Sequence, residues 1–589
     1  MNNHEIAELF KDVAAAFSIK NERKFYFQIV AYRNAAESIN LLTTQLKDLY
    51  KEGKLQTVQG IGITIKSRIE ELFKKGKVAH FEAVLRGIPK SVFVLMRVPS
   101  IGPKKAYKLA EKLALNNPKT VLEDLIIKAK SHKIAQIPSF GEKSEQDILR
   151  AILEYKKGKG KTNRMTLPYA AEISDKILTY LNQSKYVNKA VSLGSLRRMM
   201  STVGDVDIAV ATDKPNEVIE HFTAYPYKER VIEKGPTTAS ILTSGGKQID
   251  LMTVPPDSLG ALLQHFTGSK EHNVKLREYA LKKGLSLSEK GIKNLKNGKL
   301  KKYDSEEKFY NALGMSWIPP EIRENKGEIE LAIQNKLPEL VELKDIKGDF
   351  HIHSNFPIEP SHDLGETSIK EIIEYAKKLN YQYLGFSEHN PSVSKHTKDE
   401  IYSIIAKRNE KIEQIKLNNK DIRVLKLLEV DILSSGELAI DDKAIELLDA
   451  IIVSIHSSFS MSKKEMTKRI IAGLSHPKAK ILAHPTGRKI NERKGYELDF
   501  DLIFDFCKKN NKALEINSWP ERLDLPDTLI KKTVDYGVKL VINTDSHAVY
   551  QMNLMKYGVA TARRGWAKKS DIINTMDFAD IIKWIKGGE

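Results

Sequence analysis

Three aspartates in two stretches of the chain form the pattern of a divalent-cation site. Ser192–Val210 contains Asp205 and Asp207, and Lys247–Val254 contains Asp250. Apolar and polar residues alternate in both stretches as they do in strands, so Asp205 and Asp207 project from one face and Asp250 can lie beside them. Such carboxylates suit Mg²⁺, which binds one or two carboxylates together with substrate phosphates in phosphoryl transfer. A strand edge with two solvated aspartates is the alternative, and the third carboxylate weakens it.

Phosphate-binding residues lie just before the first aspartate pair. Gly194-Ser195 lets backbone N–H groups come close to phosphate oxygens. Arg198 can add charge-assisted hydrogen bonds to the same oxygens.

These motifs together resemble the palm of a known polymerase group. The segment GSLRRMMSTVGDVDI, followed by QIDLMTV, is similar to the nucleotidyltransferase palm of family X DNA polymerases, the group of DNA polymerase beta. The resemblance implies that Asp205, Asp207 and Asp250 are catalytic and hold two Mg²⁺ ions, with Asp250 near the primer 3′-hydroxyl. It also implies that the triphosphate of an incoming dNTP binds to Gly194, Ser195 and Arg198.

Length and composition indicate a multidomain globular protein. The 589 residues allow several cores, and 41% of them are hydrophobic. The chain has no apolar run of membrane-spanning length and no signal-like N-terminus, so we expect no membrane association. A single cysteine, Cys507, excludes an internal disulfide framework, and a cytoplasmic monomer is the expectation.

Positive charge is concentrated in the first part of the chain. Residues 1–164 contain 31 Lys and Arg against 17 Asp and Glu, a net +14 that leaves +5 of the total +19 for the rest. Such a distribution indicates a polyanion partner. A solvated basic surface is the alternative, and charge alone does not separate the two.

The basic segment also contains glycine-bearing turns that open helices. Amphipathic helical patterns cover Asn2–Ala16, Phe25–Leu41 and Thr44–Glu52. Turns then follow at 58–69, 98–105 and 137–143, and their outward N–H groups can hold DNA phosphates without reading sequence. The turns resemble helix-hairpin-helix elements of the family X lyase and fingers domains, and simple structural turns are the alternative, above all for the third. The DNA-binding candidates are Gly60, Gly62, Lys66, Arg68, Gly102, Lys104 and Lys105.

The resemblance also implies a deoxyribose-phosphate lyase in the first domain, but the sequence departs from the family there. Arg68 stands where we expect the Schiff-base lysine, and a guanidinium is too basic to act as a nucleophilic amine. Lys66 lies on a different helical face. We therefore expect binding of a DNA 5′-phosphate rather than lyase activity.

After the palm, Pro255-Pro256 ends the strand pattern and 259–285 is mostly helical, with a break at Phe266–Ser269. The family resemblance implies a thumb here, in which Phe266, Gly268, Asn273 and Arg277 face the nucleotide and template. His265 stands where tyrosine is usual, which leaves ribose exclusion open. A helical core role is the alternative for His265, Asn273 and Arg277 individually.

Beyond residue 345 the chemistry changes to histidine ligands. His351 and His353 lie on one face of a strand pattern, and imidazole suits Zn²⁺, Mn²⁺ or Fe²⁺. Further polar residues end apolar strand runs that alternate with amphipathic helices, as in a βα barrel, whose functional residues gather at the C-terminal strand ends.

This spacing resembles the PHP domain, the polymerase and histidinol phosphatase family, a distorted βα barrel. The resemblance implies up to three Mn²⁺ or Zn²⁺ ions held by His351, His353, Asp363, His389, Glu429, His456, His484, Asp545 and His547. One histidine in a strand is more often a core residue than a ligand, but that alternative does not explain the whole ordered set. We expect His272, His362 and His476 to be surface residues.

The predicted fold class is therefore multidomain, with all-α helix-hairpin-helix domains, an α+β palm with a helical thumb, and a C-terminal PHP barrel. The expected domains are a lyase-like N-terminal domain (1–85), fingers (86–160), palm (161–258), thumb (259–325), linker (326–345) and PHP domain (346–589). A basic linker, Lys156–Lys161, separates fingers from palm.

The resemblance spans the whole chain and implies a DNA-directed DNA polymerase that fills short gaps in repair, with gapped or primed duplex DNA and dNTP as partners. The ordered ligand set implies a second, metal-dependent 3′–5′ exonuclease activity, and cleavage at abasic sites or 3′-phosphate removal is a further activity it allows. A template-independent nucleotidyltransferase, a non-catalytic repair scaffold and a small-molecule PHP phosphoesterase are the alternatives. The last leaves the hairpins and the basic N-terminus without a purpose.

Overall fold

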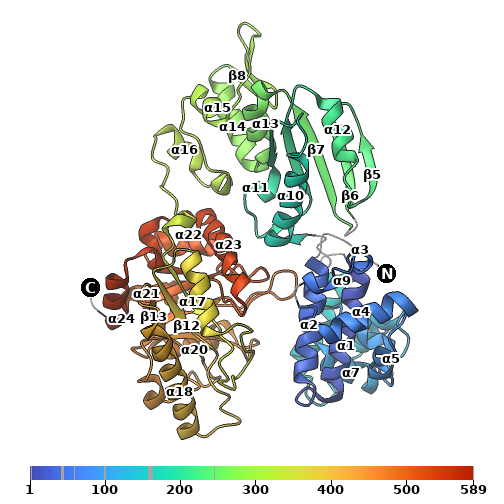
Figure 1. Ribbon diagram of the computed structural model, residues 1–589, viewed down its shortest axis with the longest axis vertical. Coiled ribbons are helices and arrows are strands. Elements are labelled where there is room, and N and C mark those ends of the chain that lie inside the picture. Colours follow the sequence, from blue (N-terminus) through green and yellow to red (C-terminus); the bar gives the residue numbers. More distant parts are fainter. Residues whose placement is uncertain are drawn as a thin grey trace.

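The computed structural model describes residues 1, 3–41, 46–58, 60–98, 101–156, 164–243 and 246–587 (Figure 1). Thr44, Pro99, Ser100 and residues 157–161 of the predicted basic linker lie outside this described part. The chain forms a helical N-terminal part, a mixed central part and a C-terminal part in which strands and helices alternate (Figure 1).

The N-terminal part consists of helices around two apolar cores. One core extends from Ile6 to Val84 and the other from Val92 to Ile152. Its elements are α1 (Asn3–Asn21), α2 (Tyr26–Leu41), α3 (Leu46–Lys51), η1 (Leu55–Thr57), α4 (Ile63–Lys75), α5 (Ala79–Leu85), α6 (Lys90–Leu95), α7 (Pro103–Lys112), α8 (Val121–Lys130) and α9 (Glu142–Lys156). In α4 the buried residues Ile65, Ile69 and Leu72 are four and three residues apart, which gives one apolar stripe facing the core.

A five-stranded sheet forms the centre of the next part, in the order β2-β4-β7-β6-β5. Its strands are β2 (Lys189–Ser192), β4 (Val206–Ala211), β5 (Lys228–Lys234), β6 (Thr238–Thr243) and β7 (Gln248–Val254). β4 and β7 are parallel, and the other pairs are antiparallel. Helices α10 (Leu167–Leu181) and α12 (Pro215–Thr223) bury their apolar stripes on the sheet. The short elements β1 (Met165–Thr166), α11 (Gly194–Arg197) and β3 (Thr202–Val203) lie at its edge.

The segment predicted as a helical thumb also contains a sheet. η2 (Pro256–Ser258), α13 (Leu259–Thr267) and α14 (Lys270–Lys282) come first, as expected. The antiparallel strands β8 (Leu285–Ser288), β9 (Gly291–Asn294) and β10 (Leu300–Lys301) follow, so the all-helical expectation is wrong here. These strands are short and partly exposed, and their polar turns mask the alternation that would have indicated them.

Residues 306–345 pack against this segment. They form α15 (Glu306–Ala312), η3 (Pro320–Ile322), α16 (Glu328–Ile333) and η4 (Leu343–Asp345). Ile329 and Ala332, within the stretch expected to be a linker, share an apolar core with Leu276 and Phe309. The connection between the central and C-terminal parts is therefore folded onto its neighbours.

The C-terminal part contains parallel strands in two sheets, β11-β12-β13 and β14-β15-β16-β17-β18. Parallel bridges join His389 to Glu429 and Ile352 to Ser546, so the two sheets meet at both sides. The strands are β11 (Gly348–Ile352), β12 (Tyr383–Phe386), β13 (Arg423–Lys426), β14 (Glu429–Asp431), β15 (Ile451–Ser454), β16 (Ala479–Leu482), β17 (Ala513–Asn517) and β18 (Lys539–Asn543). The helices are α17 (Ile369–Lys378), α18 (Lys398–Leu417), α19 (Asp442–Ile445), α20 (Lys463–Leu474), α21 (Phe500–Lys509), α22 (Asp527–Tyr536), η5 (Val549–Leu554), α23 (Met555–Arg564), η6 (Lys569–Asp571), η7 (Ile573–Thr575) and α24 (Phe578–Lys586).

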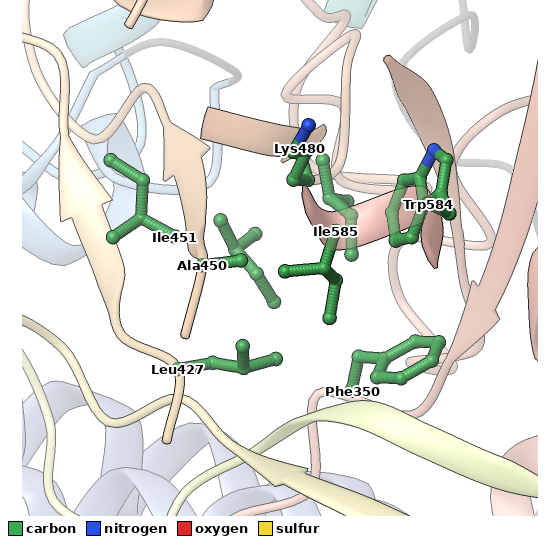
Figure 2. Close-up of a pocket in the computed structure, with 9 residues that line it drawn as sticks. Phe350, Leu427, Ala450, Ile451, Lys480, Trp584 and Ile585 are labelled. Carbon is green, nitrogen blue, oxygen red and sulfur yellow. The ribbon is translucent and has the colours of Figure 1, made fainter. Parts of the chain in front are cut away.

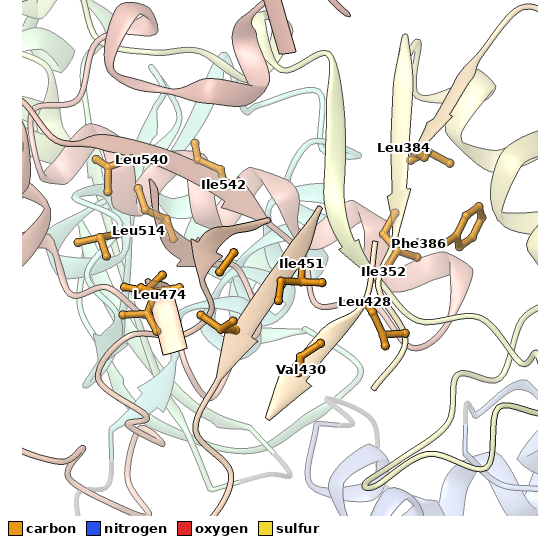
Figure 3. Close-up of a cluster of buried hydrophobic side chains, with 14 of the residues drawn as sticks. Ile352, Leu384, Phe386, Leu428, Val430, Ile451, Leu474, Leu514, Leu540 and Ile542 are labelled. Atoms are coloured by element: carbon orange, nitrogen blue, oxygen red, sulfur yellow. The ribbon is translucent and has the colours of Figure 1, made fainter. Parts of the chain in front are cut away.

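Alternate residues of these strands face two different cores. Figure 3 shows one set, including Leu384, Val430 and Leu540, in the large core that also holds the helices. The other set forms a smaller core closed by Trp584 of α24, and Figure 2 shows Phe350, Leu427 and Trp584 around a small apolar cavity there. Two residues further along the same strand faces, apolar side chains give way to polar ones: Glu429 follows Leu427, Ser454 follows Ile452, Glu515 follows Ala513 and Asn543 follows Val541. The inner face is therefore apolar at one end and ligand-bearing at the other.

No helix in the described ranges is both long and apolar enough to cross a bilayer.

Candidate functional site

The three palm aspartates lie on neighbouring strands. Asp207 of β4 is directly opposite Asp250 of β7 in the parallel register, and Asp205 immediately precedes β4. Burial, with the negative charges of Asp205 and Asp250, raises the pKa of Asp207 to about 6. A cation bound at this position would relieve that repulsion, so the carboxylates fit the oxygen ligands that Mg²⁺ requires.

Asp250 makes its own contacts within the sheet. Its carboxylate accepts hydrogen bonds from the Ser240 hydroxyl and, at 2.9 Å, from Gln248 Nε2. Within the described residues, the groups of three or more ligand atoms lying within 4.8 Å of one another all belong to the C-terminal part. The strand register thus brings the three palm aspartates together, but their ligand atoms do not converge on one point.

The Gly194 turn approaches these carboxylates closely. Gly194 has φ +58°, and a Cβ atom there would lie 2.9 Å from Asp207 Oδ2. Only glycine combines this left-handed backbone with so close an approach. The turn opens the four-residue helix α11 and places Ser195 beside the carboxylate-bearing strand.

Arg198 connects this turn to the thumb segment. Its Nη1 donates to the Thr267 carbonyl, and a Cβ atom on Gly268 would lie 2.9 Å from the same nitrogen. Phe266 is 39% exposed in the same turn. The structure therefore brings four of the predicted nucleotide-binding residues to the palm carboxylates: Gly194, Ser195, Arg198 and Gly268.

Asn273 and Arg277 lie on α14 next to the same turn. Asn273 Nδ2 donates to the His265 carbonyl at 2.7 Å, and its Oδ1 accepts from Gln264. Arg277 Nη2 lies 3.3 Å from His265 Nδ1. Burial and the Arg277 charge lower the pKa of His265, so its neutral imidazole faces the position predicted for the nucleotide.

The first two hairpins present helix N-termini to solvent. Gly62 and Gly102 are the N-cap residues of α4 and α7, both exposed and in extended conformation, and Gly60 has φ +73°. Lys104 and Lys105 are exposed beside the second turn. Free helix N–H groups and lysines there can hold phosphate oxygens.

The third hairpin is used internally. Lys108 Nζ donates to the Pro138 carbonyl at 2.6 Å and to Ser139 Oγ at 3.0 Å. Glu145 accepts from the backbone N–H groups of Ile134 and Ala135. These contacts favour the structural-turn alternative for the third hairpin.

Arg68 is half-buried rather than directed to solvent. Its guanidinium lies 3.7 Å from Glu71 and, by hydrogen bonding, lowers the pKa of Tyr32 against the larger opposite effect of burial. Lys66 Nζ is engaged with Gln56 Oε1 at 3.1 Å. Neither side chain is placed as a free nucleophilic amine.

All nine predicted ligands of the C-terminal part meet at one end of its strands, Asp363 from the loop after β11. His351, His353, Glu429 and Asp545 form one group of ligand atoms within 4.8 Å of one another, and His353, His389 and His547 form another. Asp363 Oδ1 lies 3.1 Å from His389 Nε2, and its Oδ2 lies 3.5 Å from His547 Nε2. His484 Nε2 lies 3.1 Å from Glu429 Oε1.

Several buried ligand atoms here have no hydrogen-bond partner. They are His351 Nε2, His353 Nδ1, His389 Nδ1, Glu429 Oε2, His484 Nδ1 and His547 Nε2. Leaving such atoms unpaired costs about 1–3 kcal/mol each. Metal coordination would satisfy nitrogen and carboxylate donors of this kind, so the residues fit a centre of several transition-metal ions.

The charges of the cluster compensate one another. Burial opposes charge throughout, but carboxylates raise the pKa of His351 and His389 well above the usual value, and histidines hold the pKa of Glu429 and Asp545 well below theirs. Metal ions would take the place of the histidine protons.

Sequence reasoning missed two acidic residues and misplaced two histidines. Asp431 Oδ1 accepts from His456 Nδ1 at 2.7 Å, and Glu515 Oε1 lies 2.7 Å from His351 Nδ1. Both carboxylates orient predicted ligands, and the alternation Glu429-Val-Asp431 could have indicated the first. The surface prediction for His362 is wrong, because it forms a further group of ligand atoms with Asp431 and His456.

The surface prediction for His272 is also wrong. This side chain is fully buried, with Nδ1 2.7 Å from Glu328 and Nε2 3.0 Å from the Tyr310 hydroxyl. Tertiary packing of α14 on α15 and α16 covers it. His476 is half-buried and lies 3.5 Å from Asp442.

Comparisons with known proteins bear on the whole chain. Residues 1–78 match the family model of the helix-hairpin-helix domain, and residues 262–324 match that of the DNA polymerase beta thumb. "DNA polymerase/3'-5' exonuclease PolX" of Bacillus subtilis (strain 168) is 34% identical over 588 residues, which cover 100% of both chains. DNA polymerase lambda of Rattus norvegicus is 22% identical over 310 residues, 49% of each chain.

Proposed function

This chain belongs to the family X DNA polymerases, and on that premise we propose that it fills short gaps in duplex DNA and also degrades DNA from the 3′-end. Deoxynucleotide addition takes place in the palm, and the 3′–5′ exonuclease activity resides in a C-terminal PHP barrel. The substrates are gapped or primed duplex DNA and dNTP. The enzyme acts as a cytoplasmic monomer.

One observation carries the polymerase assignment. The Gly194 turn lies against Asp207, which is opposite Asp250, while Arg198 from the same turn contacts the Thr267 carbonyl. Phosphate-binding and carboxylate groups from two strands and a helix end therefore meet in one place, as phosphoryl transfer requires.

In the proposed reaction the chain's own residues position the reactants. The backbone N–H groups of the Gly194-Ser195 turn and the guanidinium of Arg198 hold the triphosphate and stabilise the departing phosphates. Asp250 orients the primer 3′-hydroxyl for in-line attack on the α-phosphorus. Two Mg²⁺ ions held by Asp205, Asp207 and Asp250 would stabilise the attacking and leaving oxygens.

The C-terminal centre supplies the second activity. Its nine proposed ligands hold up to three Mn²⁺ or Zn²⁺ ions, with Asp431 and Glu515 fixing the imidazoles of His456 and His351. Such ions would activate the attacking water and polarise the scissile phosphate. The helix-hairpin-helix segments and the basic N-terminus hold the DNA backbone for both reactions.

Separating the two activities by mutation tests the proposal. Asp207→Ala should abolish nucleotide addition on a one-nucleotide gap in Mg²⁺ and keep exonuclease activity in Mn²⁺, because imidazole prefers Mn²⁺ to Mg²⁺. His351→Ala with His353→Ala should do the reverse. Substantial gap filling by Asp207→Ala would refute the palm assignment, and full exonuclease activity of the double variant would place the nuclease elsewhere. Extension without a complementary strand would instead indicate a template-independent transferase.

A further inference from the structure

The last helix-forming segment before the C-terminal cap reaches across to the palm and thumb. α23 lies on the side of the C-terminal part that faces the central part (Figure 1). Tyr557 of α23 belongs to the apolar core of the palm, and Trp566, just beyond the helix, belongs to the core of the thumb segment. The two parts are therefore packed together through apolar side chains at this point.

Arg564, at the end of α23, makes polar contacts across this junction. Its side chain is 4% exposed. Nη1 donates to the Arg198 carbonyl at 2.7 Å, to Glu324 Oε1 at 3.1 Å and to the Glu321 carbonyl at 3.2 Å. Nη2 donates to Asp527 Oδ2 at 2.7 Å, which ties the guanidinium to its own part of the chain.

The same glutamate oxygen also holds the side chain of Arg198. Arg198 Nε donates to Glu324 Oε1 at 3.1 Å, while its Nη1 contacts the Thr267 carbonyl. Glu324 is thus shared between the guanidiniums of Arg198 and Arg564. Because both guanidiniums are largely buried, removing one changes the charge balance and hydrogen bonding of the other.

The backbone contact acts on the same loop. The Arg198 N–H donates to the Gly194 carbonyl, and the next residue, Met199, has φ +53°. A non-glycine residue keeps this left-handed conformation only when surrounding contacts hold it. The bond from Arg564 to the Arg198 carbonyl is one such contact, because that carbonyl belongs to the peptide joining Arg198 to Met199.

We propose that Arg564 is a positioning residue for nucleotide binding, which holds Arg198 toward the triphosphate through the Arg198 carbonyl and Glu324. The nuclease part of the chain then completes the polymerase site, although none of its metal ligands takes part. This inference rests on the proposed role of Arg198 in binding the triphosphate.

The test compares Arg564→Ala with Arg563→Ala in the full-length protein. Arg563 is the matched control, since it lies on the same helix and contacts Glu321 Oε1 at 2.7 Å and the Val341 carbonyl at 3.1 Å. For one-nucleotide gap filling in Mg²⁺, Arg564→Ala should raise KM for the dNTP by about tenfold or more, the usual effect of losing hydrogen bonds to charged groups. Arg563→Ala should change it by less than about threefold. Exonuclease activity should be unchanged in both.

A double-mutant cycle with Arg198→Ala shows whether Arg564 acts through Arg198. If it does, Arg564→Ala should add little to the effect of Arg198→Ala on KM, because coupled residues are not additive. Arg564→Lys, which keeps one charged donor, should restore KM in part. Fully additive effects, or a KM unchanged by Arg564→Ala while Arg198→Ala raises it, would overturn the inference. If Arg198→Ala itself left KM unchanged, the proposed role of Arg198 would fail instead.

A folding control completes the experiment. If Arg564→Ala lost exonuclease activity and melted early, Glu324→Gln would replace it, since it weakens the same shared contact from a thumb-end loop. A raised dNTP KM with normal exonuclease activity in Glu324→Gln would support the proposal, and an unchanged KM would reject it.

Discussion

At the scale of single residues, one carboxylate next to the palm neutralises two guanidiniums. Glu306 Oε1 accepts from Arg323 Nη1 at 2.6 Å and from Arg197 Nη1 at 2.9 Å, and Glu306 and Arg323 are 3% and 0% exposed. Burial alone would raise the pKa of Glu306, but the two arginines lower it to about 2. Glu306 therefore fixes Arg197, next to the nucleotide-binding Arg198.

Glu306→Gln should destabilise the central part by about 3–5 kcal/mol at pH 7, because it leaves buried guanidiniums uncompensated. Since the folded pKa of about 2 lies below the ordinary 4.5, the ionised carboxylate stabilises the fold above about pH 4.5, and this contribution is lost as the pH falls toward 2. The difference between wild type and variant should shrink over that range in denaturant unfolding curves. Glu307→Gln, on an exposed neighbour, is the control, and an equal effect of the two variants would contradict the prediction.

Asp431 is the residue-scale feature of the nuclease centre that only the structure indicates. Asp431→Asn should weaken Mn²⁺ activation of the exonuclease by about 10–100-fold, because the carboxylate orients His456 and supports its basicity. A Mn²⁺ titration of exonuclease rate measures this, with gap filling in Mg²⁺ as an internal reference. Asp399→Asn, on an exposed residue of α18, should leave the titration unchanged. A normal Mn²⁺ requirement in Asp431→Asn would show that His456 needs no such support.

At the scale of elements, a turn determines how close phosphate groups can come to the carboxylates. The turn before α11 needs glycine at position 194, for backbone conformation and for space. The turn after α13 needs it at Gly268, where φ is +71° and Arg198 lies against the Cα. Both turns join elements from different layers, so a small displacement separates Arg198 from the aspartates.

Gly194→Ala should therefore reduce gap filling at least tenfold, because the new Cβ would meet Asp207 Oδ2 at 2.9 Å and force the turn away. Gly314→Ala is the matched control. It imposes the same left-handed strain of about 1 kcal/mol, at φ +78°, beside the flexible end of Lys283. Steady-state gap filling and thermal unfolding of both variants give the comparison. Equal losses of activity would mean that strain alone, and not contact with Asp207, causes the effect.

At the scale of the whole molecule, charge and packing divide the chain differently. The basic charge is concentrated in residues 1–164, whereas the catalytic carboxylates and histidines lie in the other two parts. The central and C-terminal parts share apolar contacts through Tyr557 and Trp566. Binding of DNA and chemistry on DNA are thus carried by different segments.

Lys104→Ala with Lys105→Ala should weaken binding to gapped DNA and reduce the salt dependence of affinity by up to about two phosphate contacts, with a slope of about 0.9 for each. Lys128→Ala with Lys130→Ala removes the same charge from the last turn of α8, and should have a smaller effect because no helix N-terminus adjoins it. Fluorescence anisotropy at several salt concentrations measures both slopes. Identical slopes for the two double variants would leave the basic N-terminal part as a general solvated surface.

The sequence by itself determined the features that local periodicity encodes. Alternation indicated the strands bearing Asp207 and Asp250, glycine turns indicated the starts of α4 and α7, and the sheet register then placed the two aspartates opposite each other. The same alternation placed His351 and His353 at the end of β11.

Only the tertiary structure decided what distant segments do to one another. The burial of His272, the contact of His362 with Asp431 and the reach of Arg564 to Arg198 join residues 56 to 366 positions apart. The short strands β8 to β10 likewise depend on pairing with one another rather than on their own sequence pattern. The physical reason is that periodicity fixes which face of an element is apolar, whereas the partner of a polar group on that face is selected by packing among elements that the local sequence does not specify.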